Sequence, residues 1–112
     1  MLQTILRMLP SARGSLAVKL IGVDGFTGRG SIRFSAAENG GALSVSLTGV
    51  AGLRADIVAD GEIVATAPIT NGRAEATFSS SKGDILPVLQ EGAQIDIQQN
   101  GDVVLTGILA RT

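Results

Sequence analysis

The stretch that most constrains the fold runs from residue 53 to 80, LRADIVADGEIVATAPITNGRAEATFSS. Two glycine-containing turn signals divide it into three runs in which apolar and polar residues alternate. Asn71-Gly72 separates Thr70 from Arg73, and a two-residue type I′ turn needs positive φ at both central positions, which Asn and Gly tolerate best. The stretch therefore predicts a three-stranded antiparallel meander.

Pairing across the Asn71-Gly72 turn gathers the apolar residues on one face, which we expect to be buried. The other face carries Arg73, Glu75 and Thr77, so the run from residue 73 to 79 predicts a strand with one buried and one solvated side. The opposed apolar pairs would be Ile69 with Ala74, Ala67 with Ala76, and Ala65 with Phe78.

The Asp60-Gly61 signal requires a choice of loop length. A two-residue loop would place Arg54 and Asp56 on the buried face, which would be costly. A three-residue loop, Ala59-Asp60-Gly61 with Gly61 as a G1 bulge, shifts the pairing by one residue. We therefore predict the three-residue loop, which turns Leu53, Ala55 and Ile57 inwards.

The rest of the chain repeats the same alternation at regular spacing. Runs such as SLAVKLIG and ALSVSLTG are separated by turn signals, whereas Pro87 limits residues 85–89 to an edge piece or an ordered loop. The strand count favours a sandwich or a barrel. We predict an all-β antiparallel β-sandwich of about seven or eight strands at residues 15–112, with Leu43, Val45, Leu47, Ile63, Ile69, Phe78, Ile95 and Ile97 in its core.

Residues 1–10 form a separate unit, an apolar N-terminal arm. Leu2, Ile5, Leu6 and Leu9 follow the i, i+3, i+4, i+7 spacing of one helical face, and Pro10 ends the pattern. A helix this short is marginal in water, so it should be ordered only when docked. The four residues are candidate partner-docking residues, on the chain's own sandwich, on a second copy or on another protein.

Composition argues against some kinds of partner but excludes neither an oxidising nor a reducing compartment. A formal charge of −1 with dispersed basic residues argues against binding to nucleic acid or an anionic membrane. No apolar run is long enough for a transmembrane helix or a signal-peptide core, so a cytoplasmic location is expected. Peripheral membrane contact by the arm stays open. Because only 17% of residues are charged and 45% are apolar, either Ser, Thr, Gly and Gln solvate the surface or part of it is covered.

The chain has no His and no Cys, which removes most catalytic and metal chemistry. Ser or Cys nucleophiles with a His base, thiolate ligands and imidazole ligands are all absent. Turn carboxylates at Asp24, Asp60 and Asp84 could supply oxygen ligands for calcium or a small ligand, although no DxDxDG spacing accompanies them and turn formation also explains them. We expect no cofactor, no metal and no catalytic residues.

A resemblance to one family covers residues 26–64. TGRGSIRF, ALSVSLTGVAG and RADIVADG resemble the bacterial CHRD family, with its TGxxxF strand, its Gly-hydrophobic-x-Gly turn and its AHIH-like strand. The resemblance implies a sandwich of the copper-zinc superoxide dismutase type. The two histidines of that family would fall on Asp56 and Val58 here, so the resemblance implies no metal-binding role for these positions.

Three functions fit these observations. The first is a non-catalytic structural or interaction module that joins a larger assembly through its arm and its sandwich surface, by self-association or with another protein. The second is a sandwich that binds calcium or a small ligand through the loops at Asp24, Asp60 and Asp84. The third is an enzyme that uses carboxylates alone, since ten acidic residues are present.

Overall fold

The computed structural model describes residues 15–37, 40–84, 86 and 89–112, and these residues form an all-β antiparallel fold. Among these residues, the only helical element is the 3-10 turn η1 (Ser80–Lys82). The predicted fold class is therefore confirmed at the level of an antiparallel all-β chain. The strands are β1 (Ser15–Gly22), β2 (Arg29–Ala37), β3 (Gly40–Thr48), β4 (Arg54–Ala59), β5 (Glu62–Pro68), β6 (Arg73–Ser79), β7 (Gln94–Gln99), β8 (Asp102–Ile108) and β9 (Ala110–Arg111).

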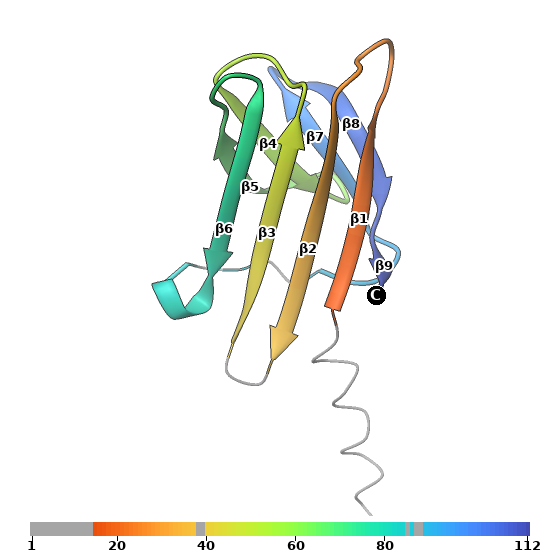
Figure 1. Cartoon of the computed structure of the whole chain (residues 1–112). Coiled ribbons are helices and arrows are strands. Elements are labelled where there is room, and N and C mark those ends of the chain that lie inside the picture. The colour runs from red at the N-terminus through yellow and green to blue at the C-terminus, as the bar shows by residue number, and fades with distance from the viewer. Residues whose placement is uncertain (1–14, 38–39, 85, 87–88) are drawn as a thin grey trace, which may run out of the picture.

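All nine strands belong to one sheet, in the order β5-β4-β7-β8-β1-β2-β3-β6, with β9 paired to β1. Figure 1 shows β6, β3, β2 and β1 as a front layer, with β5, β4, β7 and β8 behind it. Strand β1 pairs with β8 and so joins the two layers. The result is a nearly closed, barrel-like sheet. A strand count from sequence does not separate this arrangement from a two-sheet sandwich, because both need the same alternating strands.

The core lies between the two layers and contains most of the residues predicted for it. Of the eight predicted core residues, six are buried, Phe78 is half-buried against the core, and Ile63 is 62% exposed. The prediction for Ile63 was therefore wrong. The largest fully buried side chains of the core include Leu20, Ile32, Leu43 and Leu47 from the front layer and Ile57, Ile95, Ile97 and Leu105 from the back layer.

The Asn71-Gly72 turn forms as predicted. Asn71 has φ 53° and Gly72 has φ 78°. The flanking residues exchange two backbone bonds, with Thr70 N donating to Arg73 O at 2.8 Å and Arg73 N donating to Thr70 O at 3.0 Å. Local turn chemistry therefore decides this part of the chain.

The predicted three-stranded meander was wrong, because β5 and β6 separate after this turn. The isolated bridge Thr70↔Arg73 joins their ends, whereas β6 pairs along its length with β3. Pairing with β5 would oppose small residues such as Ala67 and Ala76. Strand β3 instead places Leu43 opposite Phe78 and leucine or valine opposite the alanines of β6, which buries more apolar surface.

The predicted three-residue loop at Asp60-Gly61 was also wrong. Ala59 pairs with Glu62, so the loop has two residues, with φ 48° at Asp60 and 88° at Gly61. The register shift lies further along, between the pairs Ile57↔Ala65 and Val58↔Ile63. This bulge changes the parity as the predicted loop would have done.

Because of that bulge, two of the three residues predicted to face inwards do so. Ala55 and Ile57 are fully buried, and Asp56 between them is only half-buried. Leu53 was predicted to lie inwards and is 84% exposed, since it precedes β4. The cost of burying Arg54 and Asp56 determines which side chains of β4 face inwards. It does not determine where the extra residue lies, so the prediction put that residue in the loop instead of within the strand pair.

The two end strands of the sheet carry features that protect free edges. On β6, Lys82 Nζ donates to Thr77 O at 2.9 Å, and Ser79 N donates to Asp84 Oδ2 at 2.8 Å. On β5, a bulge interrupts the strand and Pro68 has no N–H to offer. Local caps, bulges and prolines are the ordinary means by which proteins block edge-to-edge pairing.

Candidate interaction surface

One row of residues, which we call the belt, crosses all eight strands of the main sheet path. Its basic residues lie on the front layer and its acidic residue on the back layer, so the two sides of the β1/β8 boundary differ in charge. In sheet order the belt consists of Arg73, Thr48, Arg29, Ile21, Thr106, Asp96, Val58 and Ile63.

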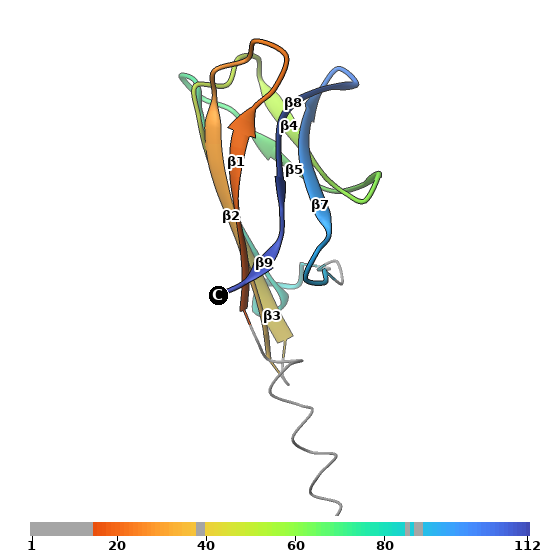
Figure 2. The ribbon, with the colours of Figure 1, turned by 90° about the vertical axis from the view of Figure 1, so that its right-hand side faces the viewer.

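An apolar stripe crosses the belt where the layers join. We define the stripe as the outward residues of β1, β8 and β9 at this boundary. Ile21 is 63% exposed and Ile108, two residues beyond Thr106 on the same face of β8, is 57% exposed. Figure 2 looks onto this side of the molecule, with β1 and β8 next to each other and β7 beyond them. The stripe comprises Ala17, Lys19, Ile21, Thr106, Ile108 and Ala110.

Asp96 borders the stripe on its back-layer side and is held in place by its neighbours. Thr106 Oγ1 donates to Asp96 Oδ1 at 2.6 Å, and Gln94 Nε2 lies 3.2 and 3.3 Å from the two carboxylate oxygens. The side chain is half-buried. These hydrogen bonds fix the direction of the carboxylate without neutralising its charge.

Lys19 and Arg29 supply the positive charge on the other side, and both are exposed. Among the described residues, the one ion pair joins Arg111 Nε and Glu91 Oε1 at 3.7 Å. Neither Lys19 nor Arg29 therefore forms an ion pair with a described carboxylate.

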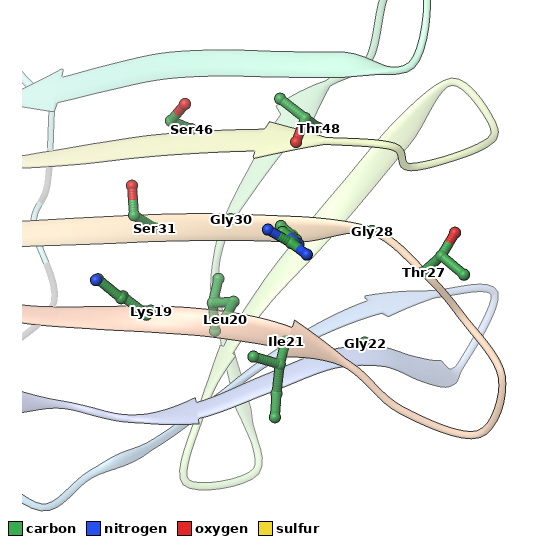
Figure 3. A pocket seen from close by; sticks show the side chains of 11 residues that line it. Lys19, Leu20, Ile21, Gly22, Thr27, Gly28, Gly30, Ser31, Ser46 and Thr48 are labelled. Atoms are coloured by element: carbon green, nitrogen blue, oxygen red, sulfur yellow. The ribbon is translucent and has the colours of Figure 1, made fainter.

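A shallow depression adjoins the stripe at the ends of β1, β2 and β3. It encloses about 550 Å³, opens widely to solvent and has no carboxylate in its lining. Figure 3 shows Ser31, Ser46 and Thr48 on adjacent strands, next to Lys19 on β1. Hydroxyl groups and cations without an opposing acid suit contact with a carboxylate from another molecule.

The backbone around the depression is crowded, which explains its glycines. A Cβ at Gly28 would lie 2.9 Å from Gly49 O, and a Cβ at Gly22 would overlap Phe26 O. These positions therefore require Gly for packing of backbone against backbone.

The three aspartates predicted as ligand candidates lie in separate turns. Asp24 occupies the β1–β2 turn with φ 51°. Asp60 Oδ1 accepts the backbone N–H of Gln94 at 2.9 Å, while Asp84 caps Ser79 at the end of β6. Within the described part of the chain, no group of three or more acidic residues is placed to hold a metal ion. The structure does not bring the three together.

Asp84→Ala is expected to lower the free energy of unfolding by about 1 kcal/mol, because it removes the hydrogen bond to Ser79 N. The loss should be the same with and without calcium, since the carboxylate acts as a cap. Thermal unfolding in calcium and in chelator measures both quantities, with the exposed Glu62→Ala as the matched control. A wild-type midpoint that rises with calcium, and no longer does so after Asp84→Ala, would contradict the capping role.

The four docking residues of the predicted arm, Leu2, Ile5, Leu6 and Leu9, lie outside the described residues, as does the arm itself. Across the residues that are described, no helix has the length and apolar content needed to cross a membrane.

No family model and no curated protein matches this chain. The resemblance to the CHRD family therefore stays a prediction. The structure places Asp56 half-buried with Thr66 Oγ1 donating to its Oδ1 at 3.0 Å, and it places Val58 fully buried.

Sequence reasoning missed most of this surface. Ile21 had a signal, since the alternation of β1 places it opposite in parity to Val18 and Leu20. No sequence signal placed Ile108 and Asp96 on a common surface with Ile21. The register of the last hairpin was ambiguous from sequence, and the pairing of β1 with β8 joins segments that are far apart in the chain.

Proposed function

We propose that this chain is a non-catalytic interaction module that joins a protein assembly through the stripe. The observation that carries the proposal is the exposure of Ile21 and Ile108 at one boundary, flanked by charges that no described residue neutralises. An apolar centre with a polar rim is the usual anatomy of a protein–protein interface. The predicted N-terminal arm, residues 1–10, would add a second contact.

The energetics favour a modest interface. Ile21 and Ile108 are each more than half exposed, so covering them would contribute roughly 1 to 2 kcal/mol apiece. Isolated exposed apolar residues need no explanation, and a patch this small is normal on a monomer. The flanking charges on two different layers are what favour a specific partner over an accidental patch.

Lysine footprinting in an extract of the source cells tests the proposal. The chain has two lysines, of which Lys19 lies in the stripe and Lys82 lies beyond β6. An amine-acylating reagent should modify Lys19 about fivefold more slowly in the extract than in the dilute purified chain, because a partner covers it. Mass spectrometry of the tryptic peptides gives both rates.

Lys82 is the matched control in the same molecule, since it is also exposed. Its rate should not differ between the two samples. Equal rates for Lys19 in the extract, in the dilute purified chain and in the purified chain at millimolar concentration would overturn the proposed surface.

A further inference from the structure

We infer that the partner of the stripe is a second copy of this chain, related to the first by a two-fold axis that runs parallel to β1 between β1 and β8. This inference rests on the proposed function and adds the identity and geometry of the partner. It follows from the order of charges along the belt.

Rotation about such an axis reverses the order of the strands across the interface. It leaves the position of each residue along the strand direction, which we call its height, unchanged. Arg29, Ile21, Thr106 and Asp96 lie at one height, because each pairs with the next across adjacent strands. Rotation places Arg29 of one copy opposite Asp96 of the other, and the same pair forms again on the other side of the axis. A closed dimer with two identical pairs is the expected form of a self-complementary interface.

The next height along the strands is also compatible with this arrangement. Ser31 pairs with Lys19 on the front layer, and Gln94 pairs with Ile108 on the back layer. The rotation places Ser31 opposite Gln94 and lays the aliphatic stem of Lys19 along Ile108, so that its ammonium group lies at the rim of the interface, partly covered by the second copy. Both exposed isoleucines become covered.

The alternative axis in the same plane, perpendicular to the strands, is disfavoured by charge. It would place β2 of one copy against β2 of the other, with Arg29 opposite Arg33. Both arginines are exposed. Like charges placed opposite each other act against a partner or an orientation, so the parallel axis is the one that the surface selects.

The size of the face predicts a weak dimer. A strand of eight residues and a width of four strands give on the order of 500 Å² per copy, or about 1,000 Å² for the pair, at ~3.3 Å per residue and ~4.8 Å per strand. Interfaces of this size lie at the low end of specific contacts. The dimer should therefore depend on concentration and weaken with salt.

Charge exchange between the two positions tests the pairing. Arg29→Asp and Asp96→Arg should each weaken self-association at least about tenfold, because each homodimer then opposes two like-charged pairs. An equimolar mixture of the two variants should recover association, since both pairs in the mixed dimer are opposite in charge. Sedimentation velocity at low salt, over a concentration series reaching the millimolar range, measures all of these species.

Arg73→Asp is the matched control. Arg73 belongs to the belt but lies on β6, two strands from Arg29 on β2, with β3 between them. Association of this variant should equal that of the wild type. Because Asp96 accepts bonds from Thr106 and Gln94, circular dichroism must first show that Asp96→Arg is folded. If it is not, Arg29→Asp with the Arg73→Asp control decides the question alone.

A short bifunctional amine reagent gives an independent readout. Lys19 lies beside the axis, so a Lys19–Lys19 cross-link should form between copies, and a Lys82–Lys82 cross-link should not. A monomer throughout the series, unchanged association of Arg29→Asp, or cross-links through Lys82 instead would each overturn the dimer. A monomeric purified chain whose Lys19 is nevertheless protected in the extract would overturn the dimer and leave the proposed interaction surface in place.

Discussion

Ile97→Ala is expected to lower the free energy of unfolding by about 2 to 5 kcal/mol, the usual cost of removing a buried aliphatic side chain and leaving a cavity. Ile97 is fully buried on β7, where it pairs with Ile57 of β4 and Leu105 of β8, both also fully buried. The layers on both sides of it are packed, so the cavity has little room to collapse. Urea denaturation followed by circular dichroism measures the loss.

Ile63→Ala is the matched control, since Ile63 has the same side chain and was predicted from sequence to lie in the core. It is 62% exposed on β5, and its truncation should change the free energy of unfolding by no more than about 0.5 kcal/mol. Similar losses for the two variants would contradict the register of β5 and the bulge that turns Ile63 outwards.

Gly22→Ala is expected to cost about 3 kcal/mol or more, because the new Cβ would overlap the backbone carbonyl of Phe26. Phe26 N donates to Val23 O at 3.0 Å, which ties this turn together. The new Cβ and the Phe26 carbonyl can therefore separate only if the turn between β1 and β2 loses this hydrogen bond. The thermal midpoint should fall accordingly.

Gly25→Ala in the same turn separates backbone overlap from conformational strain. Gly25 has φ +88°, and a Cβ there meets nothing within 4 Å. Alanine at this position should cost about 1 kcal/mol through its left-handed conformation alone. A Gly22→Ala variant no less stable than Gly25→Ala would show that the turn shifts to accept the methyl group.

The parts of the fold that sequence predicted are those decided by neighbours along the chain. Asn71-Gly72 forms its two-residue turn because Asn and Gly tolerate positive φ at those two positions. Alternation identified the buried faces of β1, β3 and β7. Neither rule depends on which strand lies next to which.

The parts that failed depend on pairing between distant segments. The alternating face of β6 fits β5 or β3 equally well by pattern, and the greater apolar burial against Leu43 and its neighbours selects β3. The candidate surface could not be predicted from sequence for the same reason. Arg29 and Asp96 lie 67 positions apart in sequence and become members of one row only through the pairing of β1 with β8.

The capped edge of β6 has a consequence for how many copies can gather. Templated growth adds strands to a free edge, one chain after another without limit. Here Thr70 engages one end of that edge, while Lys82 and Asp84 engage the other, so an incoming chain finds few backbone groups to join. The proposed dimer uses a face instead of an edge, and a face that pairs about a two-fold axis is fully occupied once a single neighbour has bound. The same three residues that complete the sheet's last strand would thus keep the assembly finite.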